Sequence, residues 1–251
     1  MTAGPLGTVF VAGVDGCRGA WAVVLMAVDD AVPPRLLRVE RFSEVLALAE
    51  APAVVAVDMP IGLPERIEGP GRAAEQAVRP LLGLRQSSVF SIASRRAVER
   101  CGADFRLACA LARETSTPPK AASIQSFGLY PKIREIDRLL VADPALAARV
   151  FEVHPEVGFW RLNGERPMAL PKKVRGRPNP EGLDERIALL AGHGVPPALF
   201  EARRPPGVGR DDAVDAAVSA VIARRILAGA ARPYPDPPPR DAHGLPMAIW
   251  V

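Results

Sequence analysis

Two long apolar runs, separated by only a short turn, constrain the fold of this chain most. Residues 8–14 are almost entirely apolar and end at Asp15, and residues 20–28 form a second run after the turn Gly16-Cys17-Arg18-Gly19. Apolar runs of this length on either side of a glycine turn are typical of buried strands. The chain is therefore predicted to open with two adjacent strands, the first of which ends in an aspartate.

The following segments extend this pair into a sheet. A strand is predicted over residues 36–42, a helix over 43–50 with Ser43 as its N-cap, and a further strand over 53–58 that ends at Asp58. Three strands joined by short turns, then a helix, then a strand, predict an antiparallel meander. A parallel strand is then added through a right-handed crossover.

The remainder of the chain is predicted to be mainly helical. The predicted helices span residues 71–82, 103–114, 131–142, 181–192 and 210–229. Pro131 suits the first position of the third helix. The other predicted segments are a fifth strand over 149–156, a basic loop over 164–180, an extended linker over 232–239 and a short strand at 247–251. Residues 1–251 are interpreted as one domain with a helical insertion at about 60–130.

Composition limits the class of protein. Hydrophobic residues make up 49% of the 251 residues, which favours a folded chain. No apolar stretch reaches the length of a membrane span, and the N-terminus lacks a signal core, so we expect a cytoplasmic protein without a membrane partner. Three cysteines without a close pair argue against a disulfide framework or a zinc site. The oligomeric state is left open, with a homodimer as one alternative.

The charge balance is mildly basic, with a net charge of +4 and only four lysines among 32 basic residues. Arginine suits contacts with phosphate, but in a chain that is also rich in Ala, Pro and Gly codon bias is the preferred explanation. Nucleic acid is therefore permitted as a partner and not established.

A third group of acids opens the predicted helix 210–229. Helix capping explains Asp211 well and Asp212 about as well as a functional role does. Asp215 lies among apolar residues, where a carboxylate needs a partner or a cation. Glu152, near the end of the predicted fifth strand, is either a further site carboxylate or an exposed strand residue.

Carboxylates from strand ends and one helix favour hard cations, so Mg²⁺ or Mn²⁺ is the expected cofactor. The predicted ligands are Asp15, Asp58, Glu152, Asp212 and Asp215. Two such ions, about 4 Å apart, activate water and stabilise the leaving oxygen in phosphodiester hydrolysis. The predicted catalytic residues are Asp15, Asp58, Asp212 and Asp215.

Five segments together resemble a predicted-nuclease family of the ribonuclease-H-like superfamily, catalogued as a domain of unknown function. They are Val14–Trp21, Val57–Pro64, Gln86–Phe90, Glu152–Glu156 and Asp211–Ala216. Asp212-Ala-Val-Asp215-Ala also resembles the late-helix motif of Holliday-junction resolvases. The resemblance covers about residues 9–230. It implies an α/β fold with a mixed five-stranded sheet, namely a three-strand antiparallel meander plus parallel strands, flanked by helices and carrying a helical insertion.

The chain departs from this family at one point. The family has an acid and a basic residue in the helix after the second motif, and here Glu75 and Arg79 stand there with a shifted spacing.

Eight residues are candidates for substrate binding: Arg18, Arg72, Arg79, Arg85, Ser88, Lys132, Lys172 and Lys173. The three arginines 72, 79 and 85 either line a phosphate path beside Asp58 or form a solvated helix face. Ser88 binds substrate or caps a helix. Lys172 and Lys173 either contact a nucleic-acid backbone or are ordinary loop charges. Lys132 is a surface residue unless the resemblance, which includes Pro131-Lys132-Ile133, gives it a role.

The leading hypothesis is a metal-dependent nuclease or phosphodiesterase, with DNA and RNA both open as substrates. An actin-like phosphotransferase is the first alternative, because the turn after Asp15 loosely resembles a phosphate turn. That class requires a duplicated domain, and the sequence shows no repeat. A non-catalytic binding protein that keeps the acids for structure is the second alternative.

Overall fold

The computed structural model describes residues 7–174 and 177–251, and the chain divides into two compact units. The first unit takes the described residues up to Asp58, together with Arg149–Arg232 and Trp250–Val251. The second takes Met59–Ala148 and Pro233–Ile249, so the insertion predicted at about 60–130 falls inside it.

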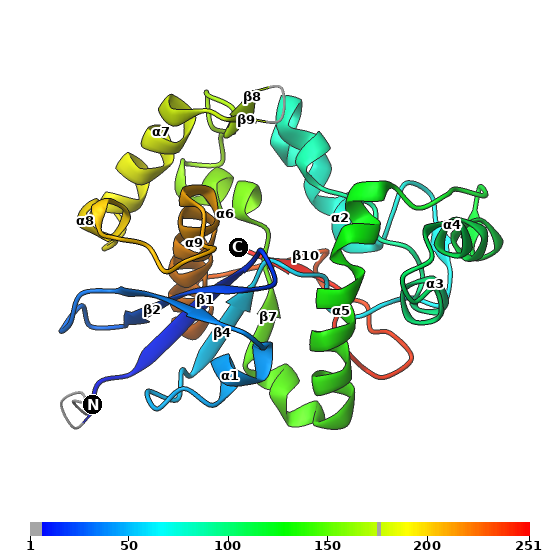
Figure 1. Ribbon diagram of the computed structural model, residues 1–251, viewed down its shortest axis with the longest axis horizontal. Coiled ribbons are helices and arrows are strands. Elements are labelled where there is room, and N and C mark those ends of the chain that lie inside the picture. The colour runs from blue at the N-terminus through cyan, green and yellow to red at the C-terminus, as the bar shows by residue number, and fades with distance from the viewer. Residues whose placement is uncertain (1–6, 175–176) are drawn as a thin grey trace. The chain divides into compact units, whose positions relative to one another are not determined.

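The first unit is built on a five-stranded sheet in the order β3-β2-β1-β4-β7 (Figure 1). Its strands are β1 (Phe10–Cys17), β2 (Ala20–Ala27), β3 (Arg35–Val39), β4 (Val54–Val57) and β7 (Val150–Glu152). The first three form an antiparallel meander, and β4 and β7 run parallel to β1. The predicted fold class is thereby confirmed, and the strand arrangement is consistent with a ribonuclease-H-like sheet.

Helix α9 (Arg210–Leu227) lies along one face of this sheet (Figure 1). Gly13 allows this close packing, because a Cβ there would lie 2.0 Å from the Ala220 nitrogen and 2.1 Å from the Ala216 oxygen. Most of α9 is consequently buried. The other helices of the unit are α1 (Phe42–Leu46), α6 (Pro155–Leu162), α7 (Pro180–Ala191) and α8 (Ala198–Glu201), and β8 (Lys173–Val174) pairs with β9 (Arg177–Pro178).

Two local predictions in the first unit are wrong. The fifth strand ends at Glu152, not at 156, because Pro155 opens α6 at a position where its missing N–H is harmless. Helix α1 begins at Phe42 with Arg41 before it, so Ser43 is not the N-cap. Phe42 packs edge-on against Trp21, with ring centroids 5.4 Å apart, and this contact favours its position at the start of the helix.

The second unit is mainly helical, with short strand pairs. Its elements are β5 (Ile67–Glu68), α2 (Ala73–Val78), the 3₁₀ segment η1 (Arg79–Ser88), α3 (Arg95–Arg100), α4 (Phe105–Glu114), β6 (Ser116–Thr117), α5 (Ile124–Ala142) and the 3₁₀ turn η2 (Pro144–Ala148). Near the C-terminus, β10 (Pro233–Tyr234) pairs with β11 (Ile249–Trp250).

Three predictions in this unit are wrong as well. The helix predicted over 71–82 ends at Val78 and continues as η1, whose backbone is kinked at Gly83. Helix α5 begins at Ile124 and runs through Pro131, because Ser123 caps it by accepting the Ser126 N–H at 3.1 Å. The segment predicted as a linker over 232–239 contains β10 instead. None of the described helices is long and apolar enough to cross a membrane.

Candidate carboxylate site

Asp15 and Asp58 lie side by side on two neighbouring parallel strands. The prediction that the first strand ends at Asp15 is wrong, because β1 stays paired with β2 as far as Cys17, whereas Asp58 directly follows β4. Val14 of β1 pairs with Val57 of β4, each aspartate follows its valine, and the Asp58 N–H donates to the Val14 oxygen at 2.9 Å. Asp15 is buried, its Oδ1 accepting the N–H of Gly16 at 2.8 Å, and Asp58 is half-buried. The sheet register alone therefore brings two of the predicted site acids together.

Asp215 joins them from α9. Side chains alternate along a strand, so Asp15 shares with Gly13 the face against which α9 packs. Asp215 is buried, and its Oδ2 forms an ion pair with Lys172. Its Oδ1 is also buried and has no hydrogen-bond partner among the described residues. An unsatisfied carboxylate oxygen at this depth is costly, which makes it a sign of an incomplete site.

The charges of these acids act on one another. Burial raises the pKa of Asp15 well above its usual value, and the charges of Asp215 and Asp58 raise it further. Burial also raises the pKa of Asp58 to about 7 and that of Asp215 to about 6, although Lys172 opposes both shifts. The site thus holds more negative charge than Lys172 compensates.

Lys172 supplies the positive charge of the site. Its side chain is 20% exposed and is hydrogen-bonded to Asp215. Burial lowers the pKa of Lys172, but the charges of Asp215 and Asp15 outweigh this effect and raise it overall. Lys172 was a candidate for contacting a nucleic-acid backbone; in this structure its ammonium group is turned to the carboxylates instead.

The other two acids of α9 are engaged at its first turn. Asp212 Oδ2 accepts the N–H of Gly209 at 2.8 Å, which is the capping role. Asp211 pairs with Lys173 at 3.0 Å. Burial raises the pKa of Asp212; it would also raise that of Asp211, but the hydrogen bond from Lys173 lowers the latter overall. The predicted metal role of Asp212 stays a prediction.

Glu152 is buried at the end of β7 and pairs in register with Val57. Because Val57 also pairs with Val14, strand alternation directs Glu152 to the sheet face opposite that of Asp15. The charge of Glu152 nevertheless contributes to the raised pKa of Asp58. Its predicted role as a metal ligand stays a prediction.

Glu156, in the first turn of α6, belongs to a buried ion pair that the sequence did not reveal. The fully buried Arg186 donates to both of its carboxylate oxygens at 2.8 Å. Pro155 was the available signal, because proline at the first position of a helix places the next residue in its first turn. The partner 30 residues away had no such signal.

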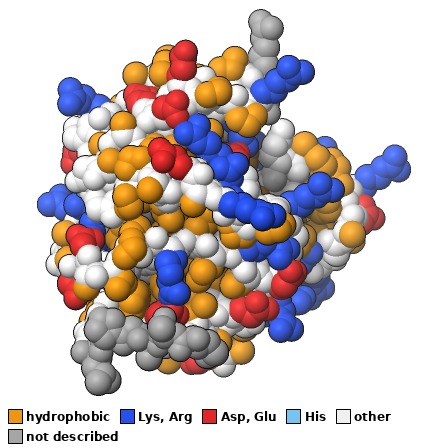
Figure 2. All heavy atoms as spheres, turned by 60° about the vertical axis from the view of Figure 1, so that its left-hand side comes forward, with side chains coloured by type: hydrophobic (Ala, Val, Ile, Leu, Met, Phe, Trp, Pro, Cys, Tyr) orange, Lys and Arg blue, Asp and Glu red, His pale blue; other side chains and the backbone are white. Residues whose placement is uncertain are grey.

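The remaining substrate-binding candidates divide between the two units. In the first unit, Arg18 is exposed in the turn between β1 and β2, and Lys173 is exposed beside Asp211. Figure 2 shows Lys and Arg side chains projecting from one face of the molecule, interspersed with acidic and hydrophobic ones. That face is mixed in sign, so it does not by itself indicate a nucleic-acid surface.

In the second unit, Arg72 is buried rather than on a solvated helix face. It donates to Glu75 at 2.8 Å and to the oxygens of Ile61 and Gly62 at 3.1 Å each. Arg79 donates to the oxygen of Val89 at 3.2 Å, among other groups. Both guanidinium groups therefore hold loops of their own unit together in this conformation.

The last three candidates also belong to the second unit. The Ser88 hydroxyl donates to the Arg85 oxygen at 2.8 Å and closes the end of η1. Arg85 is half-buried, and Lys132 is half-buried on α5. Their predicted roles in substrate binding stay predictions.

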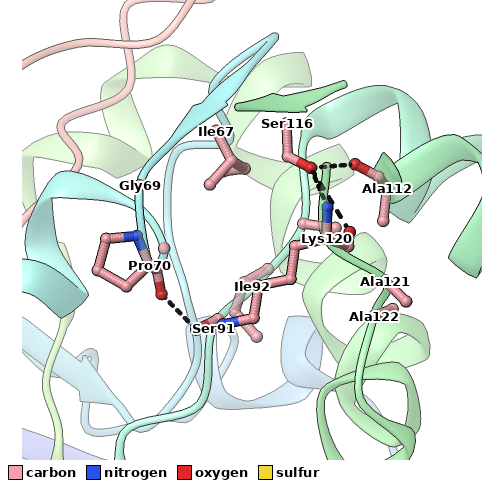
Figure 3. Close-up of a pocket in the computed structure, with 12 residues that line it drawn as sticks. Ile67, Gly69, Pro70, Ser91, Ile92, Ala112, Ser116, Lys120, Ala121 and Ala122 are labelled. Atoms are coloured by element: carbon pink, nitrogen blue, oxygen red, sulfur yellow. Dashed lines mark hydrogen bonds between the residues drawn. The ribbon is translucent and has the colours of Figure 1, made fainter. Parts of the chain in front are cut away.

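A small pocket opens in the second unit, lined mainly by apolar and small side chains (Figure 3). Ser91 Oγ donates to the Pro70 oxygen, and Ser116 Oγ donates to the Ala112 oxygen at 2.7 Å. Lys120 also lines it. Because both hydroxyl groups already donate to backbone oxygens, the pocket indicates no particular ligand chemistry.

The carboxylate site suits a hard divalent cation in its chemistry. Its donors are carboxylate oxygens, which Mg²⁺ and Mn²⁺ prefer, and Asp215 offers a buried oxygen without a partner among the described residues. Within residues 7–174 and 177–251, however, no three His, Cys, Asp or Glu side chains are already grouped as a metal site. The residues fit such an ion, and Lys172 holds the cation position in this conformation.

Of three comparisons with known proteins, only the comparison with protein families gives a match. A search of the curated proteins and a search of the solved structures each find no match. The family described as "Protein of unknown function (DUF429)" matches residues 13–240, which is most of the chain, and this protein therefore belongs to that family.

Proposed function

We propose that this protein is a divalent-metal-dependent nuclease or phosphodiesterase of the ribonuclease-H-like superfamily. The observation that carries the proposal is the convergence of Asp15, Asp58 and Asp215, all with raised pKa values, where α9 packs against β1 and β4. Strongly perturbed pKa values cluster at functional sites, where burial and neighbouring like charges shift them.

In this proposal Asp15, Asp58 and Asp215 hold Mg²⁺ or Mn²⁺, with Asp212 and Glu152 as further candidate ligands. The bound ions would supply a polarised water and charge stabilisation for phosphodiester hydrolysis. Binding a dication would also relieve the repulsion that raises the pKa values of the three aspartates. The exposed Arg18 and Lys173 are candidate contacts of this unit for a polyanion. A cytoplasmic location belongs to the same proposal.

A cleavage panel tests the proposal. Purified protein would be incubated with Mn²⁺ or Mg²⁺ and with single-stranded, duplex and branched DNA and RNA. We expect cleavage that requires metal and falls at least about a thousandfold in Asp15→Asn, equivalent to about 4 kcal/mol of transition-state stabilisation. Asp29→Asn is the matched control, because Asp29 is an exposed aspartate of the same unit. Undiminished cleavage in Asp15→Asn would sink the mechanism.

A non-catalytic binding protein is the second candidate, and the Lys172–Asp215 ion pair is the observation that favours it. A cluster partly neutralised from within could serve structure alone. Isothermal titration with Mn²⁺ separates the two: absence of binding at millimolar metal would favour this candidate. The actin-like alternative gains no support, because among the described residues of the second unit the strands are only two residues long and do not repeat the large sheet.

A further inference from the structure

Lys172 occupies an unusual position for a lysine in a basic loop. Its ammonium group lies against Asp215, and its charge also acts on Asp15 and Asp58. The next residue, Lys173, pairs with Asp211 one helical turn earlier on α9. Two consecutive lysines thus face two acids of one helix, but only the first reaches the buried cluster.

The backbone that carries Lys172 is fixed to α7. Glu185 accepts the N–H groups of Ala169 and Leu170 at 2.9 Å each. Asn179 donates its backbone N–H to the Lys172 oxygen at 2.8 Å and its side-chain amide to the Pro171 oxygen at 2.9 Å. Any withdrawal of the ammonium group is therefore a movement of the side chain, not an opening of the segment.

Gly182 confirms how tightly this segment is seated, since a Cβ there would lie 2.1 Å from the Pro171 oxygen. A lysine side chain has a flexible stem of four carbons, so its ammonium group reaches solvent readily by a change of rotamer. Lys172 is already 20% exposed, so part of its side chain meets solvent in this conformation.

The charge in the site is also unbalanced around this lysine. Asp215 uses one oxygen for Lys172, and its other oxygen is buried without a partner among the described residues. A dication would satisfy both oxygens and offset more of the negative charge than one ammonium group can. The two cations would compete for the same carboxylate.

We propose that Lys172 is the resident cation of the carboxylate site and that a divalent metal ion enters by displacing its ammonium group from Asp215. This inference rests on the proposed function, because it requires that the site take a metal. Lys172 thereby sets the metal affinity: it holds the metal-free fold together and keeps metal affinity low.

Mn²⁺ titration of the metal-free protein by calorimetry tests this directly. Lys172→Met keeps an unbranched side chain that is one heavy atom shorter and removes its charge, and we expect it to bind Mn²⁺ at least about tenfold more tightly than the unsubstituted protein. Lys173→Met is the matched control, with the same charge loss one residue away, and its affinity should stay within about threefold.

The outcomes separate the two proposals. If Lys172→Met binds Mn²⁺ no more tightly than the unsubstituted protein, the displacement is refuted and the metal site stands. If none of the proteins binds Mn²⁺ at millimolar concentration, the metal site and the displacement both fall. If only Lys172→Met binds, the displacement is supported.

A second measurement uses the unsubstituted chain, in case Lys172→Met does not fold. The chain has four lysines, so amine acylation followed by peptide mass spectrometry resolves each of them. We expect Mn²⁺ to raise the acylation rate of Lys172 several-fold relative to Lys173, and Asp215→Asn to raise it without metal. Bound Mn²⁺ with unchanged labelling of Lys172 would overturn the proposal.

Discussion

In the second unit one arginine holds three acids, whereas in the first unit three aspartates lie around one lysine. Arg95 donates to Asp137 at 2.6 and 2.9 Å, to Asp241 at 2.8 Å and to Glu99 at 2.9 Å. Asp241 also accepts the Leu63 N–H at 3.0 Å. Both regions bury charge, but only the Arg95 network supplies its most buried acids with several donors.

The difference separates charge that stabilises a fold from charge that is held for another purpose. In the Arg95 network the carboxylates have short, directed bonds, and the pKa of Arg95 is raised because these bonds outweigh its burial. In the carboxylate site burial dominates and the pKa values of the aspartates rise instead. A region that destabilises its own ionised groups is the better candidate for function.

The largest expected effect is the loss of the Arg95 network. Arg95→Met leaves Asp137 and Asp241 buried without their cation, and we expect the free energy of unfolding to fall by about 3–5 kcal/mol. Chemical denaturation followed by circular dichroism measures it. Arg96→Met is the matched control, because Arg96 and Glu114 form an exposed pair, and it should cost less than about 1 kcal/mol. Equal losses in both variants would contradict the comparison.

The opposite sign is expected in the carboxylate site. Asp58→Asn removes a charge that its surroundings disfavour, so the metal-free protein should gain about 1–3 kcal/mol in the free energy of unfolding at pH 8. Thermal melting of metal-free protein measures the gain as a higher melting temperature. Asp137→Asn, a matched substitution in the Arg95 network, should lower it. A lower melting temperature in Asp58→Asn would refute the view that this charge is disfavoured.

The raised pKa values also predict how stability depends on pH. Because the pKa of Asp58 is about 7 in the folded protein against 3.8 as its ordinary value, the folded state binds the additional proton between these limits. The free energy of unfolding therefore rises as pH falls from 8 to 5, by about 2–3 kcal/mol from this group. Comparison of the unsubstituted protein with Asp58→Asn isolates its part, since the substituted protein should show a shallower dependence. Parallel pH profiles would contradict the prediction.

The smallest effect is expected at the Lys173–Asp211 pair, which forms the rim of the carboxylate site. Lys173 is half-exposed and Asp211 partly so, and their pair should contribute less than about 1 kcal/mol. Lys173→Met should accordingly leave the melting temperature nearly unchanged, while Lys172→Met lowers that of the metal-free protein. A substantial loss in Lys173→Met would mean that the rim and the buried cluster act as one unit.

The sequence predicted most of what depends on near neighbours. The apolar runs before Asp15 and Asp58 became β1 and β4, and the late helix opened by acids became α9. The errors came at prolines and caps. Pro131 lies within α5 because Ser123 caps that helix seven residues earlier than predicted. Pro155 begins α6, although the prediction placed it in the fifth strand. Each outcome depends on a local signal, a helix cap or a proline at the first helical position, that apolar periodicity does not include.

The three central acids of the site were also predicted from the sequence, because an aspartate at the end of an apolar strand or within an apolar helix face is conspicuous. Their partners were not. Arg72 was expected either on a phosphate path or on a solvated helix face, and it is buried against Glu75. Arg186 carried no signal in the sequence of its bond to Glu156. A basic residue looks the same in the sequence whether it meets solvent or an acid.

By itself, the sequence determined the strands, the last long helix and the acids Asp15, Asp58 and Asp215, since apolar periodicity and turn chemistry act over a few residues. Only the tertiary structure decided which basic residue lies against those acids and partly balances their negative charge. Lys172 and Asp215 are 43 residues apart, and they come together only because α7 fixes the lysine-bearing segment while α9 packs on the glycine of β1. Pairing of buried charges depends on which distant segments converge, and that is a property of the packed chain.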